Sequence, residues 1–184
     1  MAVHRRQRAP SLPNLIGLEN LPRPVAYVQG GGGSLGAAQV GMLKALDWVG
    51  LRPDMIVGTS VAAGNGALAA EQVAGPPARL REICTKVNRD IVFPHGVRQQ
   101  VKMLEPGRTY PFDSPGLRRF ARFAESLFST TASKSCRLRF AAVATDIDTA
   151  EPVELTEGPL LDWLLASAAI PAVLPAIEID GRPV

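Results

Sequence analysis

Residues 25–67 read VAYVQGGGGSLGAAQVGMLKALDWVGLRPDMIVGTSVAAGNGA, and they give the strongest indication of the fold. Two short β-rich runs, 25–29 and 55–57, each end in small residues and are followed by segments with helix-forming character. A crossover between parallel strands is right-handed in nearly all proteins. The glycine loop 30–33 and the turn at Ser60 are therefore expected at one edge of the sheet, where open α/β sheets place their ligand sites.

The rest of the chain continues this alternation of strands and helices. Helices are predicted over 35–49, 61–73, 78–89, 116–128 and 159–167, and strands over 137–145, 152–155 and 176–179. Such alternation is typical of an α/β fold with a mostly parallel sheet. Prolines in the first part predict an extended basic arm over 1–23, followed by one domain over 24–184.

The composition favours an ordinary globular protein of 184 residues, with 46% hydrophobic and 20% charged residues. A net charge of only +3 and 5% aromatic residues argue against a nucleic-acid partner. Cys84 and Cys136 lack the spacing of a metal site and are expected to be reduced thiols in the core. The basic arm is not followed by a signal peptide, and Asp162 interrupts the apolar region 159–177, so a cytoplasmic location is expected.

A candidate nucleophile lies in the pentapeptide Gly58-Thr59-Ser60-Val61-Ala62, between a predicted strand and a predicted helix. This is the context of a nucleophile elbow, a strained turn that exposes a serine hydroxyl at a helix start. The free N–H groups and partial positive charge of the helix N-terminus would stabilise a developing oxyanion. The alternative is that Ser60 only caps the helix, because serine is a favoured N-cap residue.

The glycine loop admits two interpretations. Gly31, Gly33 and Gly36 have the spacing of a dinucleotide-binding fingerprint after a strand. That site needs an acidic residue at the end of the second strand, whereas Asp54 precedes the strand, and no Gly-Lys-Ser/Thr follows for a phosphate loop. A run of backbone N–H groups that forms an oxyanion hole is the favoured interpretation, and a tight strand-to-helix turn is its structural alternative.

A serine nucleophile also needs a general base. The two histidines are His4, in the arm, and His95, in a predicted loop, so a Ser–His–Asp triad is poorly supported. Asp146 and Asp148 follow the strand 137–145 and are candidates, although a turn that caps the strand end is the favoured interpretation. Two carboxylates one residue apart also suggest a metal, but no further ligands accompany them, and no metal is expected.

Several motifs occur in an order that resembles a known family. They are GGGSLGAAQVGMLKAL at 31–46, VGTSVAAGNGA at 57–67, ATD at 144–146, ASAAIP at 166–171 and IDG at 179–181. Their types and order resemble those of the patatin-like phospholipases. The resemblance extends over about residues 24–184 and is weakest over 75–135.

The resemblance implies a three-layer α/β sandwich with a mostly parallel central sheet. It also implies hydrolysis of lipid acyl esters, of the phospholipase A or lysophospholipase type, by a Ser–Asp dyad without cofactor or metal. By position, Ser60 is then the nucleophile, and Gly31, Gly32, Gly33 and Gly36 form the oxyanion-hole motif. The implied partners are a phospholipid or another lipid ester and, transiently, a membrane surface.

Three positions depart from the family pattern. Leu35 stands where many members have Arg or Lys, and Ala62 replaces the second glycine of the elbow. The dyad aspartate belongs to an Asp-Gly-Gly/Ala motif expected a few residues after Gly181, and Asp180 matches the preceding, non-catalytic position. The base is therefore expected beyond Val184. The alternative is a catalytically inactive lipid-binding protein of the same fold.

Overall fold

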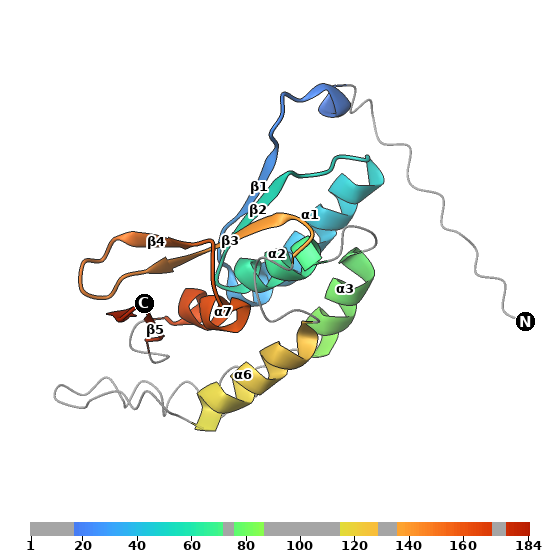
Figure 1. The fold of residues 1–184 in the computed structure, drawn as a ribbon. Helices are drawn as coiled ribbons and strands as arrows, with labels where there is room; N and C mark the ends of the chain where they lie inside the picture. Colours follow the sequence, from blue (N-terminus) through green and yellow to red (C-terminus); the bar gives the residue numbers. More distant parts are fainter. Residues whose placement is uncertain (1–16, 72–75, 87–114, 129–135, 171–175) are drawn as a thin grey trace, which may run out of the picture.

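The computed structural model describes residues 17–71, 76–86, 115–128, 136–170 and 176–184 (Figure 1). The strands are β1 (Ala26–Gln29), β2 (Met55–Thr59), β3 (Arg139–Thr145), β4 (Pro152–Leu155), β5 (Glu178–Ile179) and β6 (Arg182–Pro183). The helices are α1 (Gly36–Trp48), α2 (Val61–Glu71), α3 (Pro76–Lys86), α6 (Pro115–Leu127) and α7 (Leu160–Ala168), with single 3-10 turns at Leu18–Asn20 and Gly33–Leu35. Most of the expected arm 1–23 lies outside the described residues.

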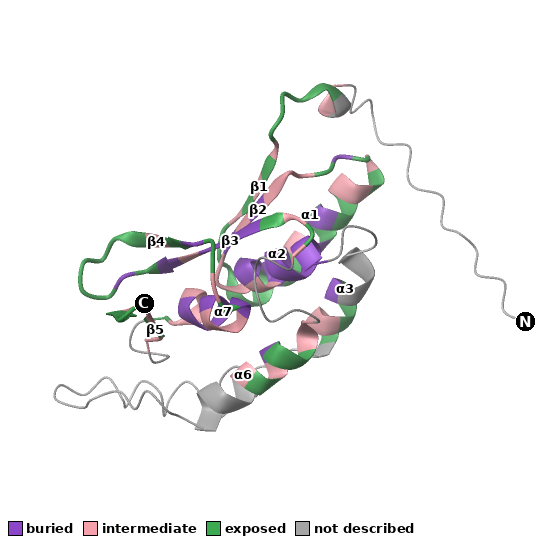
Figure 2. Cartoon of the chain, viewed as in Figure 1, coloured by how far each residue is buried: buried purple, intermediate pink, exposed green. Residues whose placement is uncertain are grey.

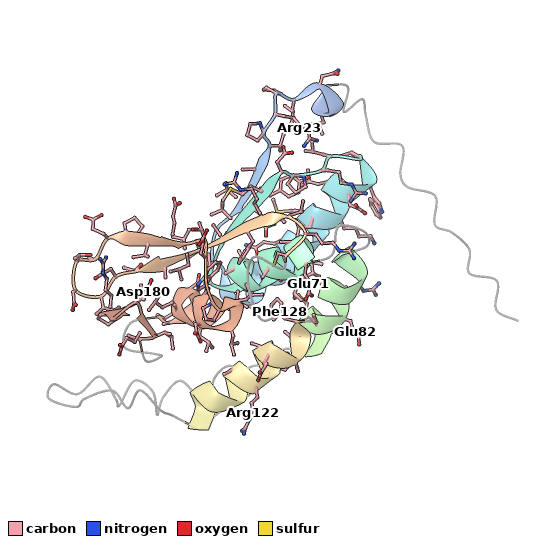
Figure 3. All side chains as sticks on the ribbon, viewed as in Figure 1. Arg23, Glu71, Glu82, Arg122, Phe128 and Asp180 are labelled. Carbon is pink, nitrogen blue, oxygen red and sulfur yellow. The ribbon has the colours of Figure 1, made fainter. Side chains whose placement is uncertain are left out.

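Four strands form one sheet in the order β1-β2-β3-β4. The first three are parallel, so that Val28 lies opposite Val57 and Val57 opposite Ala141, and β4 runs antiparallel to β3. β5 and β6 form a separate hairpin, and its turn has φ values of 51° at Asp180 (labelled in Figure 3) and 77° at Gly181. Positive φ at both central residues is the geometry of a two-residue hairpin turn, for which Asp-Gly is a preferred pair.

The described helices gather to one side of this sheet (Figure 1). Because the strand order proceeds in one direction from β1 to β3, right-handed crossovers place α1 and α2 over the same face. Helices α2 and α7 pack directly on the sheet, and α1, α3 and α6 contact these helices. The predicted α/β class, with a mostly parallel sheet flanked by helices, is confirmed.

The core lies between the sheet and α2, and its tightness comes from small residues. Ile56 and Phe140 lie side by side on β2 and β3 and face Gly66 of α2. A Cβ on Gly66 would lie 2.9 Å from Cγ2 of Ile56 and 3.2 Å from Cε2 of Phe140. The larger fully buried side chains on the helices are Leu80, Leu160 and Trp163, and α2 and α7 are largely buried in Figure 2. A helix of small residues can lie close to the strands, and this close packing constrains the turn that connects β2 to α2.

The start of the sheet is held by an acidic residue. Nη1 of Arg23, labelled in Figure 3, lies 2.8 Å from both carboxylate oxygens of Asp54. Oδ2 of Asp54 also accepts the Val25 N–H at 2.6 Å. This backbone hydrogen bond, with help from the guanidinium, holds the pKa of Asp54 below its ordinary value. Asp54 therefore joins the segment before β1 to the loop before β2, far from the end of the strand where a ribose would need it.

Candidate active site

Ser60 connects β2 to α2 in an unusual backbone conformation. Its φ is +57°, in the left-handed region that few residues other than glycine adopt. A helix N-cap residue normally has extended φ and ψ values, whereas a nucleophile elbow is a strained turn. Such strain costs on the order of 1–3 kcal/mol and is found at functional sites when the surroundings enforce it. The backbone at Ser60 is thus that of an elbow and differs from that of a simple cap.

The elbow depends on a close approach of β2 and α2. A Cβ on Gly58 would lie 2.3 Å from the carbonyl oxygen of Ala62 and 2.7 Å from the nitrogen of Ala63. Both contacts are with backbone atoms, so only glycine fits at position 58 without displacing the helix. Ala62, which stands in place of the second elbow glycine, is completely buried. An alanine at this position of the elbow is accommodated inside the core.

The glycine loop lies directly beside Ser60. Gln29, the last residue of β1, pairs with Gly58 of β2, so the turns that follow the two strands lie at the same edge of the sheet. A Cβ on Gly31 would lie 3.3 Å from Cβ of Ser60 and 3.5 Å from the carbonyl oxygen of Thr59. The juxtaposition predicted from the right-handed crossover is confirmed.

The end of the loop is fitted to the helix that follows the elbow. Gly33 has a φ of +53°, which turns the chain into α1. A Cβ on Gly36 would lie 2.5 Å from Cγ2 of Val61, so a glycine here lets the first turn of α1 approach the first turn of α2. Gly32 and Leu35 are exposed, and Leu35 is 72% exposed. An apolar side chain therefore borders the loop at position 35.

Two amides tie this loop to α2. Nε2 of Gln39 donates to the Gly30 carbonyl at 2.6 Å, which holds the start of the loop. Nδ2 of Asn65 donates to Oε1 of Gln39 at 3.0 Å and to the Gly36 carbonyl at 3.1 Å, which holds its end. Asn65 is only 5% exposed. Sequence reasoning missed both residues, and the available signal was an uncharged amide within helices of mostly apolar and small residues.

A second serine contacts the elbow from α7. The Ser60 N–H donates to Oγ of Ser167 at 2.8 Å, and the Ser167 hydroxyl donates to the Val143 carbonyl at 2.6 Å. Ser167 belongs to the Ala-Ser-Ala-Ala-Ile-Pro motif, which in the sequence served only as a family signature. The structure brings this motif to the nucleophile across 107 residues of chain.

Asp146, the first acidic candidate, is engaged in its own turn. Oδ1 of Asp146 accepts the N–H groups of Asp148 at 2.9 Å and Thr149 at 3.0 Å, and Asp146 is 5% exposed. The hydrogen bond from the Thr149 backbone is the main cause that holds the pKa of Asp146 below its ordinary value. Asp146 thus caps the turn after β3, as the favoured interpretation expected. Asp148 and Asp180 are exposed, and His95 lies outside the described residues.

Metal and membrane features can be judged over the same parts of the chain. Within 17–71, 76–86, 115–128, 136–170 and 176–184, no three His, Cys, Asp or Glu side chains are grouped as metal ligands. None of the helices described there has the length and apolar character needed to cross a bilayer. Cys84 and Cys136 are half-buried against the core without forming a disulfide, and burial raises the pKa of the Cys84 thiol.

A solved structure shares the arrangement described above. The crystal structure of VipD from Legionella pneumophila superimposes with a TM-score of 0.57 over 88% of this chain and 45% of that chain. The sequences are 13% identical in this comparison, so the likeness concerns the fold alone.

Sequence comparisons identify relatives. Patatin-like phospholipase domain-containing protein 7 of Mus musculus is 31% identical over 157 residues, which cover 83% of this chain and 11% of that protein. Patatin-like phospholipase domain-containing protein 6 of Homo sapiens is 28% identical over 156 residues, which cover 83% of this chain and 10% of that protein. Lysophospholipase nte1 of Aspergillus terreus is 56% identical over 46 residues, 25% of this chain and 3% of that protein. The chain thus spans about a tenth of the length of the first two relatives.

The family model described as patatin-like phospholipase matches residues 27–184, which include the glycine loop, the elbow and the α7 motif. This match extends over nearly all of the described structure. The chain belongs to the patatin-like phospholipase family.

Proposed function

We propose that the chain carries the nucleophile and the oxyanion hole of a lipid acyl-ester hydrolase of the phospholipase A or lysophospholipase type. The observation that carries the proposal is the left-handed conformation of Ser60, with φ at +57°, directly beside Gly31 of the glycine loop. A nucleophile and a row of backbone donors at one sheet edge are the two parts that acyl transfer requires. Membership in a family of lipid acyl hydrolases supports the choice of substrate.

In the proposed reaction, Oγ of Ser60 attacks the ester carbonyl carbon while its proton passes to a general base. The carbonyl oxygen becomes an oxyanion, which backbone N–H groups of Gly31, Gly32 and Gly33 stabilise. The Ser60 N–H is bonded to Ser167, so the loop and the first turn of α2 are left to supply the donors. The intermediate then collapses, the alcohol leaves with a proton, and water hydrolyses the acyl-enzyme in the same manner.

The base is proposed to be the aspartate of an Asp-Gly-Gly/Ala motif that follows Val184 in the natural protein. The structure supports looking for it there, because the Asp146 carboxylate is occupied by N–H groups of its own turn. Asp180 lies in the turn between β5 and β6 and is exposed. Neither of these described carboxylates hydrogen-bonds to Ser60.

The proposed substrate is a phospholipid or another lipid ester, met at a membrane surface. Leu35, 72% exposed, borders the glycine loop, and Ile170, 50% exposed, follows the helix whose Ser167 contacts the elbow. Exposed aliphatic side chains next to the glycine loop and after α7 suit the acyl chain of a lipid better than a charged substrate. A cytoplasmic location remains part of the proposal.

A fluorophosphonate probe tests the proposed function in the natural protein that contains this chain. The probe phosphonylates an activated serine, and peptide mass spectrometry should find the modification on Ser60. Ser60→Ala should abolish labelling without changing the thermal unfolding midpoint by more than a few degrees. A folded wild-type protein that binds lipid vesicles but shows no Ser60-dependent labelling would instead establish the inactive lipid-binding alternative.

A further inference from the structure

We propose that Ser167 positions the nucleophile by holding the backbone of Ser60 in its left-handed conformation. The proposal rests on the proposed function of Ser60. Ser167 touches the elbow through a main-chain N–H and is assigned no contact with substrate. Its role is therefore to position Ser60.

The two hydrogen bonds of Ser167 define the direction of its hydroxyl group. A serine hydroxyl has one proton to donate and lone pairs to accept. The proton goes to the Val143 carbonyl, 2.6 Å from Oγ, because a carbonyl can only accept. A lone pair therefore faces the Ser60 N–H, 2.8 Å away, because an amide can only donate. Both partners are backbone groups, so the hydroxyl is held without freedom to rotate.

The Ser167 hydroxyl continues the hydrogen bonding between β2 and β3 beyond their last residue pair. Thr59 is the final residue of β2, and it pairs with Val143 of β3. At Ser60 the chain turns into the left-handed region and leaves the extended geometry that a direct ladder bond needs. Oγ of Ser167 lies within hydrogen-bond distance of both the Ser60 N–H and the Val143 carbonyl, and so links the elbow to the neighbouring strand.

Ser167 is itself firmly held by α7. Leu160 and Trp163, in the same helix, are each 1% exposed, and α7 packs along β3. The link therefore joins three elements: the elbow, the neighbouring strand and a buried helix. A sparsely populated conformation persists only where the surroundings enforce it, and Ser167 adds a constraint to that of the Gly58–Ala62 contact.

Removal of the hydroxyl should affect the reaction step more than substrate binding. In Ser167→Ala the Ser60 N–H and the Val143 carbonyl both lose their partner in a half-buried place. Ser60 can then relax toward an ordinary backbone conformation, which moves its Oγ relative to the glycine loop. A misplacement of about 1 Å in a reacting group can reduce a rate about 100-fold.

The test compares Ser167→Ala, Ser167→Thr and Ser126→Ala in the natural protein that contains this chain. Ser126 is the matched control, because its hydroxyl donates at 2.6 Å to a carbonyl of its own helix on an exposed surface. Three kinetic quantities are measured for each variant: the rate of fluorophosphonate labelling of Ser60 at saturating probe, and kcat and KM for p-nitrophenyl butyrate. The final extent of labelling reports the fraction of folded sites, and amide exchange at the Ser60 N–H reports the hydrogen bond itself.

We expect Ser167→Ala to lower the labelling rate and kcat at least tenfold, with KM changed less than threefold and full final labelling. Ser60 amide exchange should accelerate. Ser167→Thr, which keeps the hydroxyl, should recover most of the loss, and Ser126→Ala should match the wild type. A folded Ser167→Ala protein with wild-type labelling rate and amide protection would overturn the proposal, as would a loss that Ser167→Thr and Ser167→Ala share when both are folded.

The outcome is separable from that of the proposed function. If the wild-type protein shows no Ser60-dependent labelling, the proposed hydrolase activity is overturned. Faster Ser60 amide exchange in Ser167→Ala then still supports the positioning link, and unchanged exchange overturns it.

Discussion

Gly58→Ala is the substitution that the structure predicts to be most damaging at the elbow. The added Cβ would lie 2.3 Å from the Ala62 carbonyl oxygen, 2.6 Å from its carbon and 2.7 Å from the Ala63 nitrogen. Ordinary contact distances begin at 3.4 Å, so the strand and the helix would have to separate by about 1 Å. No side chain can rotate away, because all three contacts are with backbone.

The size of the effect follows from this geometry. Overpacking costs typically about 1–3 kcal/mol, and a contact with backbone places Gly58→Ala at about 3 kcal/mol. For a domain of this size that lowers the thermal unfolding midpoint by about 6–12 °C. The same displacement moves Ser60 relative to Gly31, and a shift of about 1 Å predicts a rate reduced about 100-fold.

Circular dichroism melting curves and p-nitrophenyl ester hydrolysis by the natural protein measure both effects. The matched control is Gly64→Ala, in the helix α2 that Gly58 contacts, where an added Cβ meets no atom within 4 Å outside the backbone of that helix. It should stabilise the protein by about 0.5–1 kcal/mol, because alanine loses less backbone entropy than glycine in a helix. A Gly58→Ala protein that has the unfolding midpoint and the activity of the wild type would refute the close approach of β2 and α2.

Three further predictions concern the amide that holds the glycine loop, the stability of the protein at acid pH, and the general base that serves Ser60. Asn65→Ala should destabilise the protein by about 1–3 kcal/mol and slow ester hydrolysis, since the Gly36 carbonyl loses its buried donor, and urea unfolding measures the first effect. Because the pKa of Asp54 is lower in the folded protein than in the unfolded one, its contribution to stability is present above about pH 4 and is lost as pH falls through the folded pKa. Asp54→Asn should therefore reduce the acid dependence of the melting temperature, and an unchanged dependence would contradict this. Residues 1–184 alone should hydrolyse a p-nitrophenyl ester no faster than Ser60→Ala does, whereas robust Ser60-dependent turnover would show that a base within 1–184 serves Ser60.

The local part of the site was accessible from the sequence. The strand, glycine loop, helix and elbow lie within residues 25–67, and their conformations follow from glycine, from small residues and from the handedness of one crossover. These short-range rules placed Gly31 beside Ser60, and the structure confirms it. The turn role of Asp146 was also the favoured interpretation, because an aspartate after a strand commonly caps the next turn.

The polar groups that complete the site could not be predicted, because they are brought together by the packing of the helices. Gln39, Asn65 and Ser167 lie on helices where a polar side chain is equally compatible with solvent and with a buried partner. Their partners depend on how α1, α2 and α7 pack, and Ser167 reaches Ser60 across 107 residues. The fold class, the family resemblance and the two turns could therefore be predicted from the sequence, because these depend on local patterns and local backbone chemistry. The contacts that hold the turns in place depend on long-range packing, which no local pattern encodes.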